Sequence, residues 1–316
     1  MTGQRILVTG ASGFIGGVLC SQMLAHGLSV RGITRSIRKL PAGFENMNVG
    51  EIDDATNWQG ALADCSVVVH LAARAHVMVE TAKSPLTEFR RINTKGTLNL
   101  ARQASRHGVR RFIFISSIGV NGAETFARPF FAGDLAAPHS PYAVSKHEAE
   151  LALKALAVET GLEVVIIRPP LVYGPGAPGN FASMMRWLQR GMPLPLGAIH
   201  NRRSLVALDN LVDLIMTCLT HPAAANETFL VSDGQDVSTT ELLRRMGQAM
   251  NRPARLIPLP AGLLTQAAAL VGKGDMARRL CGSLQVDIEK TRTLLDWQPP
   301  LTLDQGLKKA AEGSAP

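Results

Sequence analysis

The sequence has few cysteines, and their spacing matches neither a disulfide framework nor a metal site. Among 316 residues there are four, far apart and without a C-x-x-C pair: Cys20, Cys65, Cys218 and Cys281. A chain of this length with 46% apolar residues can bury a large core without covalent cross-links. We therefore expect reduced thiols in the core, no metal site, and one or two domains.

Long apolar runs are also missing. A membrane-spanning helix needs about 20 apolar residues. The best candidates, 205–219 and 259–271, are too short, and Asp209 and Asp213 interrupt the first. Met1 leads almost directly into an apolar strand, which leaves no room for a signal peptide. These absences predict a cytoplasmic protein without a membrane span.

Aromatic residues are scarce, at 5%, whereas the formal net charge is +8. An excess of positive charge indicates an anionic partner. Nucleic acid is not expected, because the basic residues are scattered and few aromatic residues lie among them. A phosphate-bearing small molecule, or contact with an anionic membrane surface, fits the charge as well.

The most informative feature present is a glycine-rich segment near the start. Apolar residues at 6–8 predict a buried strand that ends at Gly10, and a helical pattern starts near Gly13. The spacing G-x-x-G-x-x-G, completed by Gly16, allows a tight turn, a close approach to a pyrophosphate and tight packing of helix on sheet. The helix start would bind the phosphates. This predicts a dinucleotide site, with a merely structural turn as the alternative.

Apolar strands alternate with helices along the first half of the chain. Helix starts are marked by Ser84-Pro85 and Ser140-Pro141, a capping residue followed by proline at the first helical position. These helices are expected to run to about 107 and 161. Strands are expected at 6–8, 28–34, 46–52, 65–72, 112–117 and 163–168. The pattern predicts an α/β fold with a doubly wound parallel sheet, the Rossmann arrangement.

Beyond residue 168 the composition changes, and the sequence predicts loops rich in proline and glycine. We expect residues 1–168 to form the dinucleotide-binding domain, with 204–222 returning to it and 205–219 helical. Residues 169–203 and 238–300 would form a smaller, discontinuous substrate-binding lobe.

Three side chains suggest acid–base chemistry. Tyr142 and Lys146 are four residues apart at the start of a helix and therefore project from one face. An ammonium group beside a phenol favours the phenolate and lowers its pKa, which suits proton transfer. Ser117 ends a strand on the side where α/β sheets bind ligands, so its hydroxyl could hold a substrate oxygen. The alternatives are a surface Tyr/Lys pair and a turn hydroxyl.

Together these segments resemble the extended short-chain dehydrogenases/reductases, in particular the nucleotide-sugar epimerase, dehydratase and reductase group. The matching segments are TGASGFIG at 9–16, HLAA at 70–73, NTKGT at 93–97, Ser116-Ser117, YAVSK at 142–146 and RPPLVYGP at 168–175. The resemblance covers nearly the whole chain. It implies an enzyme that transfers hydride, with Ser117, Tyr142 and Lys146 as its catalytic triad.

The resemblance also implies which residues contact the cofactor and the substrate. In this interpretation, Tyr142 exchanges a proton with a sugar oxygen, and Lys146 also holds the nicotinamide ribose. The cofactor-binding residues would be Gly10, Ser12, Gly13, Phe14, Ile15, Gly16, Glu51, Ile52, Leu71, Ala72, Ala73, Tyr142, Lys146 and Pro169. The contacts to a UDP- or dTDP-sugar would be Ser117, Asn180, Phe181, Leu196, Arg203 and, more weakly, Arg279. The family more often has aspartate where Glu51 stands.

The end of the second expected strand lacks the acidic residue typical of NAD sites. Arg35 and Arg38 stand there instead, and arginine attracts the 2′-phosphate that a carboxylate would repel. This favours NADP(H) over NAD(H), although a basic exposed loop is the alternative. NADP(H) in turn favours a reductase of a UDP-4-keto-(6-deoxy)-N-acetylhexosamine in surface polysaccharide biosynthesis. A UDP-glucose or UDP-N-acetylglucosamine 4-epimerase is the alternative, a homodimer is possible, and a non-catalytic dinucleotide sensor is a remote third reading.

Overall fold

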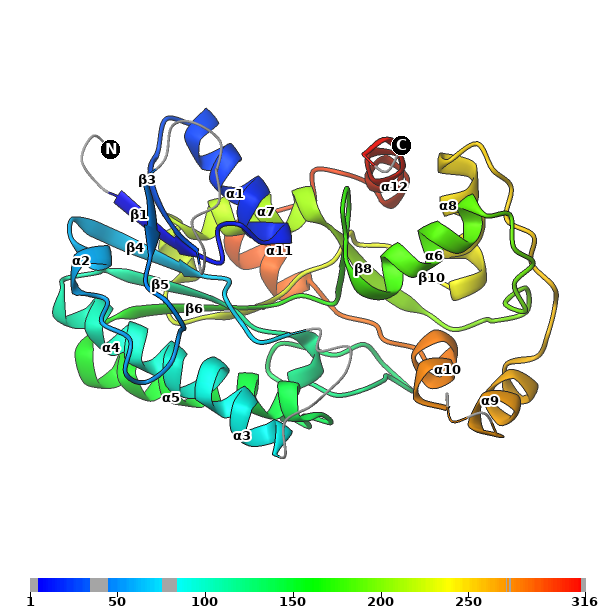
Figure 1. Cartoon of the computed structure of the whole chain (residues 1–316), viewed down its shortest axis with the longest axis horizontal. Coiled ribbons are helices and arrows are strands. Elements are labelled where there is room, and N and C mark those ends of the chain that lie inside the picture. The colour runs from blue at the N-terminus through cyan, green and yellow to red at the C-terminus, as the bar shows by residue number, and fades with distance from the viewer. Residues whose placement is uncertain (1–4, 35–44, 76–83, 271, 273, 314–316) are drawn as a thin grey trace.

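The computed structural model describes residues 5–34, 45–75, 84–270, 272 and 274–313. Its centre is a sheet of seven parallel strands in the order β3-β2-β1-β4-β5-β6-β9 (Figure 1). The chain builds from β1 to one edge and then crosses back to build toward the other. The strands are β1 Arg5–Thr9, β2 Ser29–Thr34, β3 Glu45–Asn48, β4 Cys65–His70, β5 Arg111–Ile115, β6 Glu163–Arg168 and β9 Thr228–Leu230. The predicted doubly wound parallel sheet is confirmed.

Helices cover both faces of this sheet, because alternate strand residues point to opposite sides. Ile6 and Val8 of β1 pack in one core with α1 (Phe14–Ala25) and α7 (Leu208–Cys218). Leu7 packs in the other core, with side chains of α4 (Thr97–Arg106) and α5 (Pro141–Thr160). The remaining elements around the sheet are α2 Gln59–Leu62, α3 Pro85–Phe89 and α11 Glu289–Leu295. Short 3₁₀ segments cover Ile118–Val120 and Pro222–Ala224.

The predicted boundaries of α5 match the structure. The Ser140 hydroxyl accepts a hydrogen bond from the Ala143 backbone N–H at 3.2 Å, which caps the first turn. Gly161 ends the helix at φ +75°, a conformation that suits glycine. The catalytic candidates Tyr142 and Lys146 are therefore on the first turns of a firmly bounded helix.

The long helix predicted from residue 84 is interrupted in the structure. Between α3 and α4, Arg90–Gly96 forms a π-helical segment, a rare form that is frequent at functional sites. Gly96 lies so close to Ile52 that a Cβ atom there would come within 2.9 Å of its carbonyl oxygen. The NTKGT segment thus packs closely against the loop after β3. That strand also ends earlier than predicted, at Asn48, followed by Gly50 at φ +74°.

A smaller lobe packs beside the sheet and has a core of its own. It holds a three-stranded sheet in the order β10-β8-β7. Its elements are β7 Leu171–Tyr173, α6 Gly179–Gln189, β8 Arg203–Ala207, β10 Asp236–Val237, α8 Thr239–Ala249, α9 Ala261–Leu270, α10 Gly274–Cys281 and α12 Leu303–Glu312. Tyr173 is central to this core, since its hydroxyl donates to Asp233 at 2.7 Å and to the Leu303 carbonyl at 3.2 Å.

The prediction of a helix over 205–219 is wrong for its first residues. Leu205 and Val206 belong to β8, where they pair with Leu171 and Val172 of β7. An apolar run alone does not distinguish a buried strand from a helix. The division into a dinucleotide-binding domain and a substrate lobe stays a prediction. Across the part of the chain that the structure describes, none of the helices combines the length and hydrophobicity needed to cross a bilayer.

Candidate active site

The glycine-rich turn between β1 and α1 forms a cradle that side chains would fill. Gly10 has φ +69°, and a Cβ atom there would lie 3.0 Å from the Ala72 backbone nitrogen. A Cβ atom on Gly16 would overlap the Gly10 carbonyl oxygen. Gly13, the residue before α1, has no side chain to cap the helix, so the first N–H groups of α1 remain available for an anion. These features fit the pyrophosphate of a dinucleotide.

Beside this turn, a buried chain of hydrogen bonds joins the ends of β1 and β4. The Thr9 hydroxyl lies 2.7 Å from Nδ1 of His70, and the Thr97 hydroxyl lies 2.9 Å from Nε2. The Thr97 hydroxyl already donates to the Asn93 carbonyl at 2.7 Å, so His70 donates from Nε2 and accepts from Thr9 at Nδ1. Burial and the nearby Lys146 lower the pKa of His70 to about 3, which keeps the ring neutral. The Ala72 N–H, in turn, donates to the Thr9 hydroxyl at 3.2 Å.

Asn93 ties the loop after β4 to α5. Its side-chain oxygen accepts from the Arg74 N–H at 2.8 Å, and its amide donates to the Arg74 carbonyl at 3.1 Å and to the Ser145 hydroxyl at 3.0 Å. Ser145 then donates to the Tyr142 carbonyl at 2.7 Å. The predicted cofactor contacts at 71–73 therefore lie in a segment that is fixed to the helix of the catalytic candidates. Asn93 belongs to the NTKGT segment, and nothing in that segment alone indicates this role.

Lys146 is deeply buried, with 1% of its surface exposed, and its Nζ atom lies 3.9 Å from the centre of the Phe114 ring. Burial lowers the pKa of Lys146 to about 7, although the charge of Glu150 acts in the opposite direction. The Tyr142 ring meets Phe89 edge-on at 6.1 Å between centres. Burial raises the pKa of Tyr142 to about 12. The expected lowering of this pKa is therefore wrong, because burial in low-dielectric surroundings penalises the charged phenolate.

Ser117 follows β5, at the carboxyl edge of the sheet, where it caps the short 3₁₀ segment. Its hydroxyl oxygen accepts from the Gly119 N–H at 3.1 Å. This arrangement orients the oxygen and leaves the hydroxyl proton to donate to an incoming acceptor. The predicted role of Ser117 toward a sugar oxygen is thus chemically feasible and stays a prediction.

A buried ion pair connects the elements that carry the site. No motif in the sequence indicated this pair. Glu150 accepts two hydrogen bonds from Arg168, at 2.9 and 2.5 Å, and one from the Ser116 hydroxyl at 2.5 Å. A further Arg168 nitrogen donates to Asn121 at 3.0 Å. Glu150 is one turn after Lys146 on α5, whereas Arg168 ends β6. The network therefore links the helix of the catalytic pair to two strand ends.

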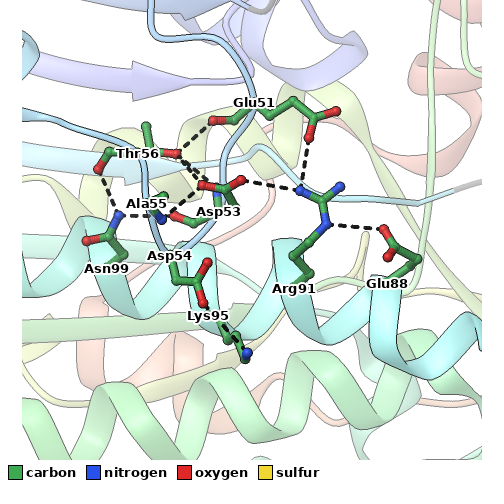
Figure 2. A network of polar contacts seen from close by, with 9 residues as sticks. All are labelled: Glu51, Asp53, Asp54, Ala55, Thr56, Glu88, Arg91, Lys95 and Asn99. Atoms are coloured by element: carbon green, nitrogen blue, oxygen red, sulfur yellow. Dashed lines mark hydrogen bonds and ion pairs between the residues drawn. The ribbon is translucent and has the colours of Figure 1, made fainter.

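Glu51, a predicted cofactor contact, lies in a loop held by ion pairs, as Figure 2 shows. Ile52, also a predicted cofactor contact, follows it in the sequence. Arg91 of the π-helical segment meets Glu51 at 2.9 Å, Asp53 at 3.4 Å and Glu88 at 3.2 Å. The Glu51 side chain is 72% exposed and so lies at the surface of the site. No motif in the sequence indicated a role for Arg91, because its partners are spread along the chain. The predicted 2′-phosphate contact Arg35 lies outside the described residues.

The two arginines predicted to contact a diphosphate are adjacent in the small lobe. Arg203 donates to the backbone carbonyls of Arg279 at 2.8 Å and of Gly282 at 3.0 Å. The charge of Arg279 helps lower the pKa of His139, after the larger effect of burial. His139 borders Gly119, so Arg279 faces the segment that follows Ser117.

The other predicted substrate contacts differ in how accessible they are. Phe181 and Leu196 are buried in the lobe core, and the Phe181 ring lies 5.4 Å from that of Tyr173. Only the backbone of these two residues could contact a substrate. Asn180, at the start of α6, is exposed. Their roles stay predictions.

Comparison with known proteins places this geometry among enzymes of sugar nucleotides. The profile of the "NAD dependent epimerase/dehydratase family" matches residues 6–232. A Vibrio cholerae protein described as UDP-glucose 4-epimerase is 48% identical over 312 residues, which cover 98% of this chain and 95% of the relative.

Two solved structures show the same fold over 98% of both chains. The UDP-glucose 4-epimerase of Thermotoga maritima, with UDP-glucose, superposes with a TM-score of 0.79 at 24% identity. The protein MoeE5, in complex with UDP-glucose and NAD, superposes with a TM-score of 0.77 at 25% identity.

Proposed function

The chain belongs to the NAD dependent epimerase/dehydratase family, and from this premise we propose that it is an NAD(H)-using UDP-sugar 4-epimerase. The observation that carries the proposal is the 48% identity, over nearly the full chain, to a protein described as UDP-glucose 4-epimerase. The glycine cradle, the buried Lys146 and Tyr142 on the same helix would supply the chemistry that such a reaction needs.

The sequence-based preference for a 4-ketoreductase has less support than this alternative. It depended on Arg35 and Arg38, which lie outside the described residues. Several relatives that align with 98% of this chain are described as 4-epimerases. An epimerase returns its hydride to the sugar and needs no NADPH supply, so cofactor choice and reaction class are linked.

In the proposed mechanism, Tyr142 removes the proton from the sugar C4 hydroxyl and later returns it. Bound NAD would supply reversible hydride acceptance at that carbon. Because the pKa of Tyr142 without ligands is about 12, the phenolate needs a nearby positive charge at neutral pH. Lys146 would provide that charge while it also holds the cofactor ribose. Ser117 would donate its hydroxyl proton to the sugar oxygen and thereby keep it beside Tyr142.

Cofactor binding would use residues that the fold already fixes. Gly10, Gly13 and Gly16 leave room for the pyrophosphate at the start of α1. The loop at 71–73, held by Asn93, would run along the cofactor. In the small lobe, Arg203 and Arg279 would bind the UDP diphosphate, since guanidinium groups match phosphate oxygens.

The test is to incubate the protein with UDP-glucose and, separately, with UDP-N-acetylglucosamine, and to follow the sugar by NMR. We expect conversion to the C4 epimer with only a catalytic amount of NAD. The competing reaction is tested with UDP-4-keto-6-deoxy-N-acetylglucosamine and NADPH. Stoichiometric NADPH consumption without epimerisation of either sugar would establish the reductase instead.

The cofactor preference can be measured directly. NADH and NADPH are titrated against the wild type and Arg35→Ala by calorimetry. The epimerase proposal expects tighter binding of the NAD form. Tighter binding of NADPH, weakened about ten- to a hundredfold by Arg35→Ala, would support the basic-loop interpretation and the reductase.

A homodimer remains part of the proposal. Leu151, Ala155 and Val158 are exposed on α5 and are spaced to form one apolar stripe. We expect light scattering to give twice the chain mass, and Val158→Glu to return the protein to a monomer.

A further inference from the structure

Helix α9 is uncharged and mostly apolar, and yet it lies at the surface. Its sequence, AGLLTQAAAL, contains no charged residue. The structure describes all ten of its residues, and none of them is buried. Leu263 is 56% exposed and Leu270 is 89% exposed, and Ile257, just before the helix, is 52% exposed. Isolated exposed apolar residues are ordinary, but a cluster of them marks an interaction site.

The exposed residues of α9 form one face. Gly262, Leu263, Gln266, Ala267, Ala269 and Leu270 are exposed, and at about 100° per residue they all lie on one side of the helix. Ala261 and Leu264, on the opposite side, pack against the core of the small lobe. The helix is therefore held to the protein by one side, while its outer side offers leucine and alanine to the surroundings. Figure 1 shows α9 beside α10, at the end of the small lobe far from the seven-stranded sheet.

Basic residues flank this apolar face. Arg252 and Arg255 are exposed on the chain that enters α9, and Arg278 is exposed on α10, which packs against it. In the sequence from 252 to 279 there are five basic residues and one acidic residue. An uncharged helix between cationic segments is the composition of a surface that binds anionic lipid, where apolar side chains enter the headgroup boundary and arginines meet phosphates.

We propose that α9 and its flanking arginines dock the small lobe on an anionic membrane surface. A second copy of the chain is a poorer occupant, because two-fold packing of this face on itself would bring the arginines of both copies together. A bilayer needs no shape complementarity, only an exposed apolar helix and positive charge beside it. The cavity of about 560 Å³ between His200 and Cys281 is lined by Pro260 and Ala261 at the start of α9, so docking would bring that cavity close to the membrane.

The experiment is co-sedimentation with vesicles of phosphatidylglycerol and phosphatidylcholine in equal parts, compared with vesicles of phosphatidylcholine alone. The wild type should bind the anionic vesicles, and the binding should weaken as salt is raised, since salt screens the arginines. Arg255→Ala should weaken binding about fivefold, the effect of one basic residue near a charged bilayer. The double variant Leu263→Glu, Leu270→Glu should abolish it, because it places carboxylates on the face that enters the lipid.

The matched control is Leu294→Glu, which makes the same chemical change at an exposed leucine of α11, beside the central sheet. It should bind the anionic vesicles like the wild type. Circular dichroism and thermal melting check that each variant is folded. Wild-type binding by the α9 double variant, or equal binding to both kinds of vesicle, would overturn the proposal. So would an oligomer in solution that only the α9 substitutions dissociate, because the face would then bind a second copy.

Discussion

Glu150 lies one helical turn beyond Lys146 on α5, and its charge raises the pKa of that buried amine while burial lowers it to about 7. Among the described residues, the other groups that surround Lys146 carry no negative charge. His70 is neutral, Tyr142 is a protonated phenol, and Phe114 offers only its ring face. The charge state of Lys146 at neutral pH therefore depends on Glu150.

Removing the charge of Glu150 should move the pH dependence of the enzyme. Lys146 loses its proton as the pH rises through about 7, so cofactor affinity and turnover should fall on the alkaline side. In Glu150→Gln the pKa of Lys146 is lower still, and the fall should move to lower pH by roughly one unit or more. The measurement is NAD affinity and kcat across pH.

Two further variants separate this electrostatic effect from a purely structural one. Glu150→Asp keeps the charge and should restore most of the wild-type profile. Glu148→Gln removes a half-buried carboxylate on the same helix that pairs with Arg90, and it should not move the profile. Equal losses at every pH in Glu150→Gln, without displacement of the curve, would mean that Glu150 only stabilises the fold.

Tyr142→Phe should lower kcat by about 10²–10⁴-fold and leave NAD affinity nearly unchanged. The ring can still pack against Phe89, but the transferable proton is gone. The chain has only one other tyrosine, Tyr173, which provides the control. Tyr173→Phe leaves a buried Asp233 oxygen without its donor and should cost about 1–3 kcal/mol of stability, with turnover retained at low temperature. A Tyr142 variant with near-normal kcat would remove this residue from the mechanism.

Gly16→Ala should disrupt the cofactor cradle, whereas Gly17→Ala should not. At residue 16 the added methyl group overlaps the Gly10 carbonyl, and backbone must move to relieve the overlap. At residue 17 the nearest atom is 3.9 Å away, an ordinary contact. We expect a loss of about 1–3 kcal/mol of stability and at least about tenfold in NAD affinity for the first variant only. Calorimetry on both variants decides the matter, and equal effects would contradict the geometry.

Arg91→Ala tests the network of Figure 2. Its partners are partly exposed, so the free energy of unfolding should fall by only about 1 kcal/mol or less. The loss in NAD-binding free energy should exceed the loss in the free energy of unfolding, because the loop of Glu51 and Ile52 is no longer held by Arg91. Lys95→Ala, which breaks an exposed 3.6 Å pair with Asp54, should change neither quantity. Unchanged NAD binding in the Arg91 variant would separate this network from the cofactor site.

Local signals in the sequence were sufficient to predict much of the nucleotide-binding half. The glycine spacing, the apolar strands and the Ser-Pro helix starts are read within a few residues, and the structure places a strand, a tight turn and a helix there. Ser140 caps the start of α5 and Gly161 ends it, and both effects depend only on neighbouring residues. Position and spacing indicated acid–base chemistry at Ser117, Tyr142 and Lys146, and the resemblance to the family added that they form a catalytic triad.

What could not be predicted depends on partners distant in the sequence. Arg168 gives no sign that it meets Glu150, because only the folded sheet and helix bring them together. The apolar run at 205–207 becomes a strand only because β7 is beside it. The pKa of Tyr142 could not be inferred from its spacing to Lys146, since it is raised by burial, a property of the whole fold.

Helix α12 also determines when the small lobe can complete its core during synthesis. Leu303, Leu307 and Ala310 of α12 complete the core of the small lobe, and the Leu303 carbonyl accepts from the Tyr173 hydroxyl, 130 positions earlier in the chain. The small lobe therefore cannot close until α12 has left the ribosome, whereas β1 to β6 can pair long before. During that interval the apolar residues of the small lobe are open to solvent and to chaperones. A nascent chain that lacks α12 should contain a folded sheet beside a lobe that proteases readily cut.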